Sequence, residues 1–140
     1  MCLPANYNGI IIYNIMRFFE TVVLPGLVLL ALDGVFLFLN KEMFELQVAE
    51  VQRVVLEVKY LGAALCYALL IFALYYFIIK DRRSVADAMI LGFVIYGVYE
   101  TTTYALLKKW KLRTMMTDTL WGGILFGLTT MIVYKLTPIR

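Results

Sequence analysis

Three acidic residues lie in or beside segments that are otherwise apolar enough to cross a membrane: Asp33, Glu100 and Asp118. An aspartate at the centre of a membrane helix costs about 2.5 to 3.5 kcal/mol to insert, so its presence indicates a partner, a wet cavity or a function. Carboxyl groups in such a place can bind a proton, a cation or an amine-bearing lipid headgroup. None of this chemistry requires a cofactor, and we expect none.

Other polar and aromatic residues share helix faces with these acids. Around Glu100, the side chains of Tyr96, Tyr99 and Thr103 recur at steps of three and four residues, which places them on one face of a helix. Trp121 follows Asp118 at a step of three. The predicted binding pocket therefore consists of Asp33, Tyr96, Tyr99, Glu100, Thr103, Asp118 and Trp121.

Each acid also has a purely structural interpretation. Asp118 lies between Thr117 and Thr119, where a helix N-cap would accept hydrogen bonds from free backbone amides. Asp33 and Glu100 could instead join helices to one another through hydrogen bonds to threonine and tyrosine. The sequence leaves both interpretations open.

The composition is that of an integral membrane protein. Of the 140 residues, 63% are hydrophobic, and the mean hydropathy is +0.83. Soluble proteins have an apolar share of roughly 45 to 50%. The net charge of +3 is carried by small clusters beside the apolar runs, which favours contact with membrane lipids and argues against nucleic-acid binding.

The residue types needed for common catalytic and metal sites are scarce. The chain has no histidine and only two cysteines, so it lacks the usual general base and cannot form a cysteine zinc site. It also lacks a glycine-rich phosphate loop and a recognisable nucleophile motif. We therefore predict no metal site, no catalytic residues and no enzymatic activity.

Four apolar segments are each long enough to cross the roughly 30 Å hydrocarbon core of a bilayer. They predict an all-α, polytopic, multi-pass bundle of four transmembrane helices at about residues 21–39, 60–79, 86–107 and 119–136. Residues 20–140 would form this domain, after an N-terminal interfacial segment or extension at 1–19. In the fourth segment, Gly123 and Gly127 have the spacing that allows helix backbones to approach closely.

A different pattern connects the first two spans. Between Lys41 and Lys59, apolar side chains such as Phe44, Val48 and Val51 recur at steps of three and four, with charged residues between them. This periodicity predicts an amphipathic helix.

Successive spans cross the membrane in opposite directions. The position of each acid along its span therefore predicts its depth in the membrane. Asp33 and Glu100 lie near the exits of the first and third spans, and Asp118 opens the fourth. All three acids are therefore predicted to lie in one half of the membrane, within roughly 10 Å of the interface. A pocket there would open toward the predicted loops at 41–59 and 108–113.

The most specific residues resemble a known family. They are Leu30-Ala-Leu-Asp33, the block Gly92-Phe-Val-Ile-Tyr-Gly-Val-Tyr-Glu-Thr-Thr102, Ala105, Leu107, Trp110, and Asp118-Thr-Leu-Trp-Gly122. Together they resemble the predicted membrane-protein family known as domain of unknown function 2177, over about Met16 to the C-terminus. The resemblance implies a four-span protein. It departs where the family usually has aspartate followed by Leu-Thr-Asn, since this chain has Glu100 followed by three threonines.

Two functions fit these observations better than a third, an enzyme that acts on lipid, for which two carboxylates are present but the motifs named above are absent. In the first, the acidic pocket binds or moves a proton, a cation or a lipid headgroup. Four short spans leave little room for a conduction path, so transport would require a homo-oligomer or a larger membrane complex. In the alternative, the chain is a non-catalytic structural subunit of a larger membrane assembly.

Overall fold

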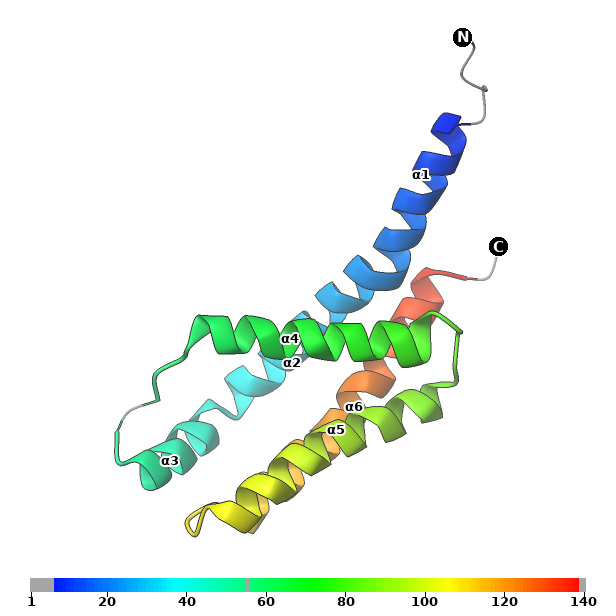
Figure 1. Cartoon of the computed structure of the whole chain (residues 1–140). Helices are drawn as coiled ribbons and strands as arrows, with labels where there is room; N and C mark the ends of the chain where they lie inside the picture. The colour runs from blue at the N-terminus through cyan, green and yellow to red at the C-terminus, as the bar shows by residue number, and fades with distance from the viewer. Residues whose placement is uncertain (1–6, 55, 139–140) are drawn as a thin grey trace.

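The computed structural model describes residues 7–54 and 56–138, and every regular element within these ranges is helical. Figure 1 shows their arrangement. The helices are α1 (Tyr7–Phe18), the π-helix η1 (Phe19–Val23), α2 (Leu24–Leu39), α3 (Lys41–Gln52), α4 (Tyr60–Leu74), the π-helix η2 (Tyr75–Ile79), α5 (Val85–Leu106) and α6 (Leu112–Leu136). Residues 1–6 of the predicted N-terminal segment lie outside the described ranges.

Four helical segments are long and apolar enough to cross a membrane, which confirms the predicted fold class. They are Asn8–Leu39, Tyr60–Ile79, Val85–Leu106 and Leu112–Leu136. Half of the most apolar part of the fourth segment is buried inside the protein, against 22% for each of the others. The fourth segment, α6, is therefore the central helix of the bundle.

The first span is longer than predicted from its apolar run alone. α1, η1 and α2 form one continuous helix, and its 32-residue candidate span, Asn8–Leu39, is about 48 Å long. A widened turn at η1 interrupts it just before Pro25, which has no amide to donate to the carbonyl of Thr21. α1 projects beyond the end of the bundle, as Figure 1 shows.

The amphipathic helix between the first two spans is present but ends earlier than predicted. α3 stops at Gln52 because Arg53 adopts a left-handed conformation, with φ of 58°, and donates its amide to the carbonyl of Ala49. The described residues between Arg53 and Lys59 are not helical. The helical periodicity of the valines therefore continues in the sequence past the point where the helix ends.

α5 and α6 form an antiparallel pair that holds the middle of the protein together. Two glycines allow their backbones to touch, since a Cβ atom on Gly92 would collide with the carbonyl of Gly122. Gly127 leaves room for the side chain of Met89, which would come within 2.5 Å of a Cβ atom at that position. The small residues of α6 thus do pack against a neighbouring helix, as their spacing indicated.

Candidate functional site

Asp33 joins three helices. Its Oδ2 atom accepts a hydrogen bond of 2.6 Å from the hydroxyl of Tyr67 on α4, and its Oδ1 atom accepts one of 2.8 Å from the indole nitrogen of Trp121 on α6. The aspartate itself belongs to α2 and is buried. Both carboxylate oxygens are therefore engaged by donors from separate helices.

Aromatic packing fixes the orientation of the Trp121 indole. Its ring stacks on that of Phe36, with the centroids 4.3 Å apart and the planes 6° from parallel. Phe36 in turn meets Phe44 of α3 edge to face at 6.1 Å. The rings of Phe44, Phe36 and Trp121 therefore orient the indole that donates to Asp33, and they also hold α3 against the bundle.

Glu100 is the most deeply buried of the three acids, with 1% of its surface exposed. Its Oε2 atom accepts a 2.8 Å hydrogen bond from the indole nitrogen of Trp110, which lies in the short turn between α5 and α6. The amide of Trp110 donates to the carbonyl of Leu107 across that turn. The tryptophan thus connects the membrane interface to the buried acid.

Asp118 does not cap a helix, contrary to the structural interpretation of its sequence position. α6 begins at Leu112 with Lys111 as its N-cap residue, so Asp118 lies inside the helix and is buried. The prediction was wrong because residues 112–117 contain no glycine or proline and extend the helix toward its N-terminus. Only residues 107–111 are left to form the turn.

Asp118 is close to the other two acids. Its carboxyl group neighbours that of Glu100 across the α5–α6 interface, and it is within electrostatic range of Asp33. The structure therefore places all three predicted acids in one buried region of the bundle.

The remaining predicted pocket residues divide into two groups. Tyr96 packs its ring against Gly122 and lies within electrostatic range of Asp33 and Asp118. Tyr99, however, is 62% exposed, and Thr103 donates its hydroxyl to the Tyr99 carbonyl in the same helix. The structure thus gathers Tyr96 and Trp121 with the acids and leaves the Tyr99 side chain on the outer surface.

Gln47 is a buried polar residue that sequence reasoning missed. Its Nε2 atom donates to the carbonyl of Lys109, and its Oε1 atom accepts from the amide of Lys111 and the hydroxyl of Thr114, all at 2.9 to 3.1 Å. It thereby satisfies a free backbone amide at the start of α6 and fastens α3 to the α5–α6 turn. Gln47 lies three residues after Phe44 and so shares its face of the helix, which is the feature of the sequence that could have indicated its burial.

Cations do not neutralise these acids within residues 7–54 and 56–138. The ion pairs described there are Lys41 with Glu45 at 3.6 Å and Lys111 with Glu50 at 2.9 Å, and all four side chains are partly exposed. In the same part of the chain, no group of three or more His, Cys, Asp or Glu side chains is arranged to hold a metal ion. The partners of the buried acids are neutral aromatic donors and other carboxyl groups.

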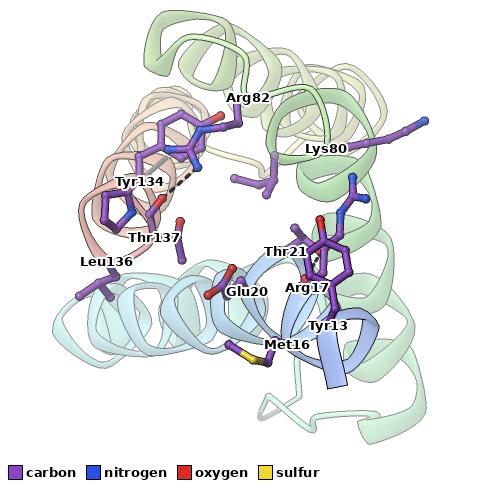
Figure 2. Close-up of a pocket in the computed structure, with 12 residues that line it drawn as sticks. Tyr13, Met16, Arg17, Glu20, Thr21, Lys80, Arg82, Tyr134, Leu136 and Thr137 are labelled. Carbon is purple, nitrogen blue, oxygen red and sulfur yellow. Dashed lines mark hydrogen bonds between the residues drawn. The ribbon is translucent and has the colours of Figure 1, made fainter. Parts of the chain in front are cut away.

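A cavity of about 570 Å³ lies at the opposite end of the bundle, where α1 and η1 approach the ends of η2 and α6. None of the three acids lines it. Figure 2 shows this cavity, with Arg17, Glu20 and Arg82 around it. The structure thus has two polar regions at different ends of the same four helices.

Comparison with known proteins supports the expected family. The model of the family described as "Predicted membrane protein (DUF2177)" matches residues 18–135, which include all three acids and both tryptophans. No curated protein and no solved structure shows a significant match to the chain. The match extends over most of the sequence and over all of α2 to α5. The chain is therefore an integral membrane protein of the DUF2177 family.

Proposed function

We propose that the protein binds and exchanges a proton at the buried pair of carboxyl groups formed by Glu100 and Asp118. The observation that carries this proposal is the burial of both acids beside each other at the α5–α6 interface. Two carboxylates that share a site cannot easily both be ionised. This is a binding function rather than a catalytic one.

The surroundings of the pair support a proton rather than a metal ion or an amine. A bound cation would separate the two carboxyl groups and coordinate oxygen atoms from both, whereas a shared proton draws them together. The other contact of Glu100 is the neutral indole N–H of Trp110, which can stabilise a charged or an uncharged carboxyl group. A single proton satisfies this set of contacts.

Asp33 has a different role in this proposal. Both of its oxygen atoms accept hydrogen bonds, one from Tyr67 and one from Trp121, so it has less capacity to take part in proton exchange. Its carboxyl group also lies within electrostatic range of Asp118. Asp33 thus sets the geometry and the electrostatic environment of the exchanging groups.

Trp110 is the proposed point of access for the proton. It lies in the α5–α6 turn beside exposed lysines, and its side chain bonds directly to Glu100. A small opening of this turn would bring water to the glutamate without separating α5 from α6. Exchange would then take place with the membrane face on which Lys108, Lys109 and Lys111 lie.

The test is proton uptake by the purified protein in liposomes that contain a pH-sensitive dye. Glu100→Gln and Asp118→Asn should each abolish the uptake of the buried proton, whereas Glu57→Gln, which changes an exposed glutamate outside the helices, should leave it unchanged. Uptake that is equal in all four proteins would overturn the proposal. Far-UV circular dichroism of each variant controls for folding.

A second candidate function is assembly with other membrane proteins. It is favoured by α1, which carries exposed apolar side chains on all sides, including Ile11, Ile12 and Ile15, and extends past the bundle. The first span is about 18 Å longer than the hydrocarbon core. A homo-oligomer or a larger complex would cover this helix. Cross-linking in membranes should capture a partner that is lost after Ile11→Ser and Ile15→Ser.

A further inference from the structure

The cavity at the far end of the bundle is built from residues that are distant in the sequence. Its walls come from α1 and η1, from the end of η2 with the turn after it, and from the end of α6. It combines charged groups with apolar side chains such as Met16, Ile79 and Leu136. Figure 2 shows these segments arranged around an open space.

Arg82 is held in place on one side of this cavity. One of its terminal nitrogens donates a 2.9 Å hydrogen bond to the carbonyl of Thr137, and its guanidinium lies over the ring of Tyr134 at 4.5 Å from the centroid. Tyr134 is itself anchored, since its hydroxyl donates to the carbonyl of Arg83 at 2.8 Å. A guanidinium has five N–H donors, and only one of those of Arg82 is bonded to another described residue, which leaves donors that can face a ligand.

Two further charged side chains that line the cavity, Arg17 and Glu20, come from the first span. Arg17 and Glu20 both line the cavity, three residues apart on the continuous helix of α1 and η1. Neither takes part in an ion pair with another described residue. Lys80, by contrast, extends away from the space in Figure 2, with its amine 4.9 Å from the ring centroid of Tyr76.

The cavity lies where two of the apolar spans end, which is the level at which lipid headgroups are expected. Two of the spans end beside it, at Ile79 and Leu136, and the tyrosines Tyr13 and Tyr134 line it as aromatic side chains do at membrane interfaces. Positive groups at this level attract phosphate, and the apolar part of the lining can accept the start of an acyl chain. A carboxylate among them suits an ammonium group.

We propose that this cavity binds a phospholipid whose headgroup carries both a phosphate diester and a primary amine, with Arg17 and Arg82 on the phosphate and Glu20 on the amine. A lipid is favoured over a free phosphate compound because of the apolar lining at the membrane surface. The site is separate from the Glu100 and Asp118 pair, so it does not depend on the proposed proton exchange.

The test is native mass spectrometry of the intact protein, released from detergent, with three lipids of identical acyl chains: phosphatidylethanolamine, phosphatidylglycerol and phosphatidylcholine. The wild-type protein should retain phosphatidylethanolamine most strongly. Arg17→Gln should weaken this binding about tenfold, which corresponds to the loss of one hydrogen bond to a charged group. Glu20→Gln should remove the preference over phosphatidylglycerol.

The matched control is Lys135→Gln, which removes one exposed positive charge from the last turn of α6 without altering the cavity lining. It should leave the lipid preference unchanged. Arg82→Lys, which keeps the charge but loses the planar guanidinium, should weaken binding while the protein remains folded. Equal retention of all three lipids, or equal losses in Arg17→Gln and Lys135→Gln, would overturn the proposal. Soluble phosphoethanolamine that binds as tightly as the lipid would overturn the assignment to a membrane ligand.

Discussion

The charged groups at the two ends of the helical bundle have opposite environments: buried at one end and exposed at the other. At the acidic end, Asp33 and Glu100 are buried, and each accepts a hydrogen bond from a tryptophan. At the other end, Arg17 and Glu20 are exposed beside a cavity of about 570 Å³ and make no ion pair with a described residue. The buried end therefore suits the proposed binding of a proton, whereas the exposed end suits the proposed binding of a larger molecule.

The strongest test of this contrast disrupts the helix pair that carries the acidic end. In Gly92→Ala, the new methyl group would collide with the backbone of Gly122, which cannot move without separating α5 from α6. The variant should lose about 3 kcal/mol of stability or more. Gly34→Ala is the matched control, because its methyl group meets no atom within 4 Å. Thermal unfolding in detergent measures both, and equal stability of the two variants would contradict the close packing.

The next largest effect is expected at the junction of three helices. Asp33→Asn replaces one of two acceptor oxygens by a donor, so the hydroxyl of Tyr67 or the indole of Trp121 would lose its partner. We expect a loss of about 1 to 3 kcal/mol. Asp81→Asn, in the exposed turn after η2, should change stability little. If both variants unfold at the temperature of the wild-type protein, Asp33 does not hold the helices together.

A smaller and more local effect is expected for Gln47→Ala. The change leaves the amide of Lys111 and the hydroxyl of Thr114 without their acceptor, which should loosen α3 from the α5–α6 turn. Amide hydrogen exchange should rise in residues 41–52 and 108–112 and stay constant in the cavity segments. Gln52→Ala, at the exposed end of α3, is the control. Unchanged exchange in both variants would show that the buried amide does not fasten this helix.

The smallest effect on stability is expected for Glu100→Gln. Glutamine keeps an oxygen acceptor for Trp110 and removes one of the two neighbouring acids, so the free energy of unfolding should change by less than about 1 kcal/mol. Proton binding should nevertheless be lost, whereas lipid retention at the other end should be unaffected. A variant that loses both properties would show that the two ends are not independent.

The ends of the spans are predicted best where charged residues flank the apolar segment. Lys59 precedes the second span and Lys80 follows it, and the structure places that helix at Tyr60–Ile79 as predicted. The start of α6 was predicted too late, because Arg113 and the threonines near it resemble a loop in composition. The early end of α3 also could not be predicted, since it depends on the left-handed conformation of Arg53.

The acidic residues of the candidate site could be predicted from the sequence, but the residues that donate hydrogen bonds to them could not. Helical spacing and alternating spans indicate that Asp33, Glu100 and Asp118 lie near one another, and the structure places them so. The donors to Asp33 are Tyr67 and Trp121, from two other spans, and spacing within one helix carries no information about such contacts. The cavity could not be predicted from the sequence, because its walls depend on how α1 approaches the end of α6.

Infrared spectroscopy of the protein in lipid bilayers tests the central claim most directly, because a protonated carboxyl group has a carbonyl band distinct from that of a carboxylate. At neutral pH the wild-type protein should show one such band, and the Glu100→Gln, Asp118→Asn double variant should lack it. Glu57→Gln should keep it. Absence of the band from the wild-type protein, or its persistence in the double variant, would contradict a proton held between Glu100 and Asp118.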